Sequence, residues 1–139
     1  MNGYSNKPLY EKLGIKKGYN ILLANESKLD MPYYLRGEIE ELELSMDSNE
    51  KYDFVHLFHD NASLMKKGMI SALERIKSNG MIWISWPKKA SKIKTDITED
   101  IIRDYAISIG LVDVKVCSVS EEVWSGLKLV IRIENRIKE

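Results

Sequence analysis

The sequence predicts an α/β domain of three layers, with helices on both faces of a mostly parallel β-sheet that ends in an antiparallel hairpin. Three observations support this prediction. Ile21–Leu23 and Tyr52–Phe58 are predominantly apolar on both sides, as strands covered on both faces are. Residues 51–89 contain a strand, an amphipathic helix and a second strand, which together form a βαβ unit. Two alternating strands, Val112–Val119 and Leu127–Ile133, form the closing hairpin.

Length and composition indicate one folded domain over residues 1–139, with loose ends at 1–7 and 134–139. The 21 basic side chains balance the 21 acidic ones, so no overall charge favours nucleic acid or a membrane surface. Cys117 is the single cysteine, and the sequence has neither a secretory signal nor an apolar run of the ~20 residues that span a membrane. We therefore expect a cytoplasmic protein; its oligomeric state is left open.

The first half of the chain is expected to contain two short helices and two strands. Residues 8–13 form a helix ended by Gly14, and residues 19–24 form the first strand. Asp30 and Pro32 are expected to start a short helix through Leu35 that Gly37 closes. Residues 42–46 alternate between apolar and polar, which predicts a half-exposed strand at the edge of the sheet.

The second half contains the stronger periodic signals. A helix capped by Asp60 or Asn61 runs to Asn79-Gly80, and the strand from Met81 to Trp86 follows it. Pro87 ends that strand because proline lacks the backbone N–H that ladder pairing needs. The last helix is capped by Asp96 or Thr98 and is closed by Gly110.

Local patterns at four places match a known architecture: Leu13–Gly18 before the first strand, Tyr52–Val55, Lys77–Trp83 and the closing hairpin. Together they resemble the class I methyltransferase type of Rossmann fold, and this resemblance implies a reduced, Rossmann-like domain. Such enzymes follow the first strand with a glycine-rich loop that lets the cofactor approach the backbone. The first strand here runs into Asn25–Leu29, which contains no glycine.

A second resemblance is more specific and is carried by four segments: Ser85–Lys89, Thr95–Asp100, Leu111–Cys117 and Trp124–Lys128. These are similar to a family of small bacterial proteins that is catalogued as a domain of unknown function. This resemblance implies a lineage and a location, and it supplies neither an activity nor a cofactor.

Four segments are expected to meet at one edge of the sheet: Asn25-Glu26, His59-Asp60, Ser85–Lys89 and Trp124-Ser125. The reason is that the carboxyl ends of parallel strands lie together and bind ligands there. The lysines at 88, 89, 92 and 94, followed by a helix N-terminus, indicate a site for phosphate or carboxylate, or simply a solvated basic loop. The predicted ligand-binding residues are Ser85, Trp86, Lys88, Lys89, Thr95, Trp124, Ser125, Asn25 and His59.

Two of the residue types in this set leave alternatives open. Trp86 and Trp124 either stack on a flat ligand ring or pack beneath the loops. His59 with Asp60 allows acid–base chemistry, but no third ligand accompanies His56 and His59, so no metal site is expected.

The leading functional hypothesis is a binding module, without demonstrable catalysis, for a small anionic or nucleotide-like ligand at this edge. One alternative is a divergent methyltransferase that uses adenosylmethionine. The other is a regulatory or scaffold domain that binds a protein partner.

Overall fold

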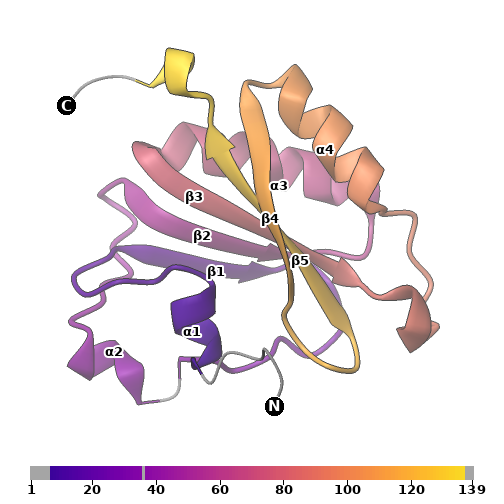
Figure 1. Cartoon of the computed structure of the whole chain (residues 1–139), viewed down its shortest axis with the longest axis horizontal. Helices are drawn as coiled ribbons and strands as arrows, with labels where there is room; N and C mark the ends of the chain where they lie inside the picture. Colours follow the sequence, from indigo (N-terminus) through magenta and orange to yellow (C-terminus); the bar gives the residue numbers. More distant parts are fainter. Residues whose placement is uncertain (1–6, 36, 137–139) are drawn as a thin grey trace.

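The computed structural model describes residues 7–35 and 37–136, which form one α/β domain around a five-stranded sheet (Figure 1). The strand order is β1-β2-β3-β5-β4; β1, β2 and β3 are parallel, and β5 is antiparallel to both of its neighbours. The predicted mostly parallel sheet with a closing hairpin is therefore confirmed. The strands are β1 (Ile21–Asn25), β2 (Tyr52–Phe58), β3 (Ile76–Pro87), β4 (Leu111–Ser118) and β5 (Trp124–Ile131).

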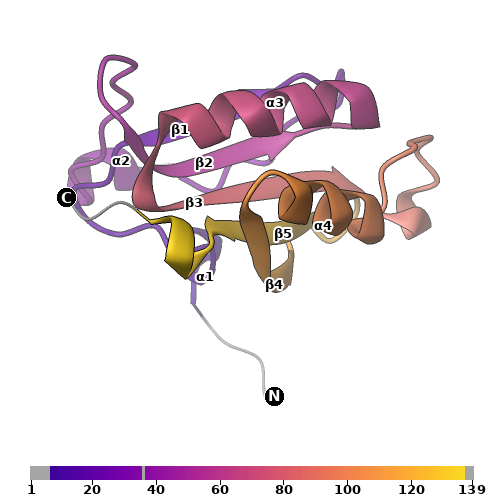
Figure 2. The same ribbon diagram turned by 90° about the horizontal axis from the view of Figure 1, so that it is seen from above.

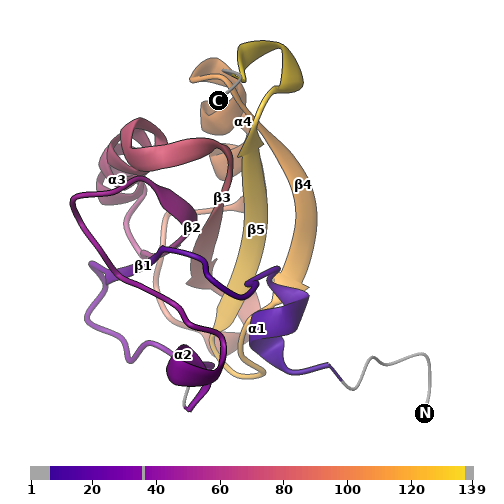
Figure 3. The same cartoon turned by 90° about the vertical axis from the view of Figure 1, so that its left-hand side faces the viewer.

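Helical and irregular segments cover both faces of the sheet, which gives three layers (Figures 2 and 3). The longer helices, α3 (Ala62–Arg75) and α4 (Glu99–Ser108), lie on one face. The short helices α1 (Leu9–Lys12) and α2 (Glu38–Glu41), with the chain between β1 and α2, lie on the other. Within the described residues no helix is long and apolar enough to cross a membrane. Of the ends predicted to be loose, residues 1–6 and 137–139 lie outside the described ones.

Side-chain caps start both long helices. Asn61 accepts a hydrogen bond from the backbone N–H of Leu64, and Thr98 accepts one from that of Ile101. These residues satisfy N–H groups that have no partner inside the helix. Asp96, the other residue considered for the second cap, instead accepts from the N–H of Ala62 at 2.7 Å and so caps α3 from a distant loop.

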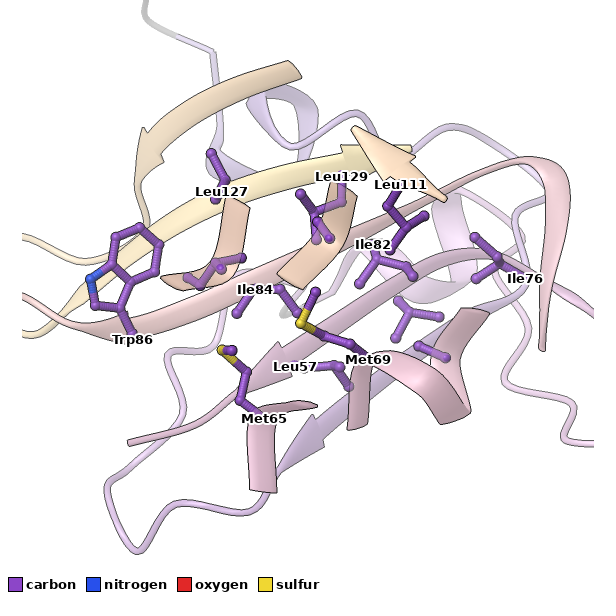
Figure 4. Packing of buried hydrophobic residues seen from close by; sticks show 14 of the residues in the cluster. Leu57, Met65, Met69, Ile76, Ile82, Ile84, Trp86, Leu111, Leu127 and Leu129 are labelled. Atoms are coloured by element: carbon purple, nitrogen blue, oxygen red, sulfur yellow. The ribbon is translucent and has the colours of Figure 1, made fainter. Parts of the chain in front are cut away.

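Two hydrophobic cores lie on opposite faces of the sheet. In the first, Met65, Met69 and Ala72 of α3 pack against β2 and β3 (Figure 4). In the second, Trp83 is completely buried, and its indole N–H donates to the carbonyl of Leu13 at 2.8 Å. Each face of the sheet thus packs against a different set of covering segments.

The structure corrects the prediction for residues 30–46. Residues 30–35 are not helical, and Gly37, at φ +84°, begins α2 instead of closing a helix. The chain is irregular there, and Tyr34 and Leu35 are buried in the second core. The strand predicted at 42–46 is reduced to one parallel bridge between Ser45 and Asn20, because Glu43 takes a left-handed conformation at φ +52°.

Two strand boundaries are also corrected. β3 begins at Ile76, so Asn79 and Gly80 lie within a strand and do not terminate the preceding helix. Ile76 pairs with Tyr52, and a register irregularity follows before the ladder resumes at Met81. In the hairpin, β5 begins at Trp124, which was predicted to lie in the connecting loop.

The side chain of Asn20 makes several of the hydrogen bonds that hold the chain before β2 against the start of β1. Its Oδ1 accepts from the N–H of Asp47 at 2.7 Å and from the hydroxyl of Ser45 at 3.0 Å. Its Nδ2 donates to the carbonyls of Asp47 and Lys51 at 3.0 and 3.2 Å. Asn20 is 6% exposed, so these bonds are shielded from water and fix the entry into β2.

Replacing Asn20 with Ala is expected to lower the free energy of unfolding by about 2–4 kcal/mol, because several backbone groups lose their partner at once. The matched control is Asn25→Ala, which removes hydrogen bonds of an exposed turn and should cost less than about 1 kcal/mol. Urea denaturation followed by tryptophan fluorescence measures both. Equal losses in the two variants would contradict the role given to Asn20.

Candidate functional site

The carboxyl ends of β1, β2 and β3 meet at one edge of the sheet, beside the start of β5 (Figure 1). Asn25 pairs with Phe58, Phe58 with Ser85, and Ser85 with Gly126. The backbones of the four predicted segments therefore lie side by side. Their side chains, however, lie on different faces of the sheet, and some are buried while others are exposed.

Five of the nine predicted site residues line one cleft, which has a volume of about 530 Å³. It lies beyond the end of β3, between the loop that follows this strand and the start of α4. We call it the basic cleft. Its lining residues are Trp86, Pro87, Lys88, Lys89, Lys92, Ile93, Lys94, Thr95, Ile97, Thr98, Glu99 and Ser125.

The lysines of the basic cleft fall into two groups. Lys88 turns its ammonium group toward the β4–β5 loop, where Nζ donates to the Ser118 hydroxyl at 2.7 Å and to the Glu121 carbonyl at 3.2 Å. Lys89, Lys92 and Lys94 are exposed, and none has an ion-pair or hydrogen-bond partner for its ammonium group in the described part of the chain. Three positive charges are consequently available to a ligand.

The N-terminus of α4 contributes less positive charge than its position suggests. Glu99 and Asp100 already lie in the first turn, where carboxylates compensate the helix dipole. Both are bound by Arg103, which also donates to Asp113 at 3.1 Å. Any anion held in the basic cleft would therefore be held by the lysines and not by the end of the helix.

The outer wall of the basic cleft is tied to the body of the domain by Thr95. Its hydroxyl donates to the carbonyl of Asp60 at 2.7 Å and accepts from the N–H of Ile97 at 3.1 Å. The hydroxyl thus shapes the loop. Contact between Thr95 and a ligand stays a prediction.

The two tryptophans of the predicted site are both buried. Trp86 is 8% exposed and forms the floor of the basic cleft, as part of the first core (Figure 4). Trp124 is 1% exposed and packs edge-on against Phe58, with 5.2 Å between the ring centroids. Its indole N–H donates to the carbonyl of Asp30 at 3.0 Å, so Trp124 holds down the segment after β1.

Ser85 belongs to a buried hydrogen-bond network that the sequence did not reveal. His56 is completely buried, with Nε2 2.8 Å from the Ser85 hydroxyl and Nδ1 2.7 Å from the Tyr34 hydroxyl. Burial lowers the pKa of His56 from 6.5 to about 3 and raises that of Tyr34. Tyr34 gives no signal in the sequence, because its partner is 22 residues away.

The remaining two predicted residues lie outside the basic cleft. Asn25 is exposed, and its side chain accepts from the N–H of Ser27 and donates to the carbonyl of Leu29. His59 is 1% exposed and lines a separate groove beside Gly68 of α3. Burial lowers the pKa of His59, while Glu26 and Asp60 oppose the shift.

Because the pKa of His56 is lowered in the folded protein, protons bind preferentially to the unfolded chain below pH 6.5. The free energy of unfolding should be insensitive to this residue above pH 6.5 and should fall below it, by about 1.4 kcal/mol per pH unit. The pKa of His59 is also lowered by burial, so this residue too reduces the free energy of unfolding as the pH falls. In His56→Gln, which can still donate and accept, urea denaturation at several pH values should give a shallower slope. An unchanged slope would contradict the assignment.

Comparison with solved structures finds methyltransferases. A SAM-dependent methyltransferase from Aquifex aeolicus matches with a TM-score of 0.56 and 15% identity, over 89% of this chain and 88% of that one. The ribosomal protein L11 methylase from Lactobacillus delbrueckii subsp. bulgaricus matches with a TM-score of 0.54 and 11% identity, over 89% and 75%. The magnesium protoporphyrin IX methyltransferase from Synechocystis PCC 6803, solved with bound SAH, matches with a TM-score of 0.55 and 11% identity, over 84% of this chain and 75% of that one. These likenesses establish a methyltransferase-like Rossmann fold.

No curated protein matches the chain by sequence. The family model described as "Protein of unknown function (DUF3052)" matches residues 11–133, which include the sheet, both long helices and the whole basic cleft. The match agrees with the resemblance carried by residues 85–89, 95–100, 111–117 and 124–128. The chain therefore belongs to the DUF3052 family.

Proposed function

We propose that this protein is a binding module for a small phosphate-bearing or other anionic ligand, which it holds in the basic cleft. The observation that supports this most directly is the set of three unpartnered ammonium groups, on Lys89, Lys92 and Lys94, around a cleft of about 530 Å³. A charged group that lacks a counter-charge gains more from an anion than one already paired. The apolar parts of the lining, including Trp86 and Ile97, would contact the uncharged part of the ligand.

The shape of the cleft favours the anionic group as the main point of recognition. Trp86 is too deeply buried to offer a full ring face, so stacking of a nucleotide base would be limited to the edge of its indole. The carboxylate of Glu99 lines the same cleft and would disfavour a second anionic group near the start of α4.

A divergent methyltransferase is the second candidate, supported by the fold alone. The loop after β1 argues against it: residues 25–35 contain no glycine, and none of them has a positive φ. The polar groups of Asn25 close this loop on itself, and the indole of Trp124 binds the carbonyl of Asp30. Little of this backbone is left free for a cofactor to approach.

Calorimetric titration with three probes tests the proposal: inorganic phosphate, adenosine monophosphate and adenosylmethionine. Binding of a phosphate-bearing probe should weaken at least about tenfold in the variant Lys89→Gln, Lys92→Gln, Lys94→Gln, and it should weaken as salt rises. The matched control, Lys16→Gln, Lys28→Gln, Lys51→Gln, loses the same charge from exposed positions outside the cleft.

The two variants separate a local site from a general charge effect. Equal weakening in both variants, or none in either, would contradict a site in the basic cleft. Heat with adenosylmethionine that is unchanged by the cleft variant, without binding of either phosphate probe, would replace this proposal with the methyltransferase function.

A further inference from the structure

The two edges of the sheet differ in how they are protected against pairing with another strand. β4 carries charges at Asp113 and Lys115, and its register with β5 is irregular between these residues. Charged side chains and bulges are common means of blocking an exposed edge. β1, at the other edge, reads Ile-Leu-Leu-Ala-Asn and has no charge, no proline and no irregularity in its pairing with β2.

The backbone of β1 has hydrogen-bonding groups directed away from the sheet. The carbonyl of Asn20 and the N–H of Glu26 bind β2, so even-numbered residues face inward. The N–H of Ile21 donates to Ser45, so odd-numbered residues face outward. Beyond this bridge, the N–H and carbonyl of Leu23 have no hydrogen-bond partner among residues 7–35 and 37–136.

Grooves with apolar side chains lie on both sides of this edge. The groove on the α3 side has a volume of about 420 Å³ and a mixed lining. Its apolar residues are Leu22, Ala24, Leu57, Leu64 and Ala72, and its polar ones are Glu26, His59, Lys67, Ser71 and Arg75. On the α2 side, a groove of about 380 Å³ is lined by Leu23, Tyr33, Leu35, Gly37, Ile39 and Met46. Tyr33 and Met46 are 82% and 54% exposed, so the apolar side chains of this groove are open to solvent. A strand added to β1 would place alternate side chains in each groove.

The rims of the two grooves carry different charges. Lys67 and Arg75 border the groove on the α3 side together with Glu26, so two basic side chains accompany one acidic one. Lys67 has no partner within the described ranges, whereas Arg75 donates to the Tyr52 hydroxyl at 3.2 Å. Glu40 and Glu41 lie on α2, next to Ile39 of the other groove. An acidic side chain on one face of an incoming strand and a basic one on the other would therefore be favoured.

A second copy of this chain does not suit the edge. Each copy carries its own Ser45 bridged to Ile21. In an antiparallel pair of β1 strands centred on Leu23, the Ser45 segment of one copy would lie where the other strand must run. The part of β1 after Ile21, whose outer edge Ser45 does not cover, therefore has room for a short strand from a different protein.

We infer that the β1 edge binds an extended segment of another protein, which adds a strand to the sheet through the backbone of Leu23. Its apolar side chains fill both grooves, and an acidic residue faces Lys67 and Arg75 on the α3 side. This surface is separate from the basic cleft, and either site can exist without the other.

A display library of random peptides of about six residues, the length of an ordinary strand, is the probe. It is selected on the wild-type protein and counter-selected on Leu23→Pro, which removes the outward N–H while leaving the hydrogen bonds to β2 in place. Enriched peptides should be apolar at alternate positions and carry an acidic residue. Their affinity should fall at least about tenfold in Leu23→Pro and less in Leu23→Ala, which keeps the N–H.

Two measurements on the wild-type protein keep the test independent of whether Leu23→Pro folds. Methylation of alternate backbone nitrogens of a selected peptide should abolish its binding, and the unmethylated peptide should slow hydrogen exchange at the Leu23 N–H. Equal binding of both peptides would overturn the inference. Protection of Leu23 that rises with protein concentration alone would also overturn it, because a second copy would then occupy the edge.

Discussion

The fold depends on burying β3 on both of its faces. Every residue from Gly80 to Pro87 is buried, and this strand joins the parallel half of the sheet to the antiparallel half. One face needs α3 and α4 as its cover, and the other needs α1 and the chain after β1. The same constraint places the basic cleft, because Pro87 ends the ladder and the chain must leave the sheet there.

The polar groups around His56 in this core are satisfied without charge. His56 connects the Ser85 hydroxyl on β3 to the Tyr34 hydroxyl on the covering segment, so one neutral side chain joins the sheet to its cover. A buried imidazole with both nitrogens bonded costs little, whereas its protonated form would be strongly disfavoured. The reduced region between β1 and β2 is fixed in this way at Tyr34 and by the side chain of Asn20 at its other end.

The sequence predicted those parts whose structure follows from local periodicity. The apolar spacing of Met65, Met69 and Ala72 requires an amphipathic helix, and Pro87 requires the end of a strand. Residues 30–46 could not be predicted, because their conformation depends on distant partners of Tyr34 and on the left-handed Glu43. In the site, the sequence predicts the basic loop at the correct edge. The burial of Trp124 depends on its contact with Asp30, and the direction of the Lys88 ammonium group depends on its contact with Ser118, and both partners are distant in the sequence.

The position of β5 has a consequence for how the chain acquires its fold. β5 is synthesised after β4 but lies between β3 and β4, so β3 lacks its second neighbour and β4 its only one until residues 124–131 are available. A nascent chain emerging from the ribosome would carry the apolar β3 with one side unpaired for the time needed to make about 40 more residues. The residues of β1, β2, α3 and β3 are therefore all available before those of β5, and closure of the sheet requires pairing between segments that are far apart in the sequence.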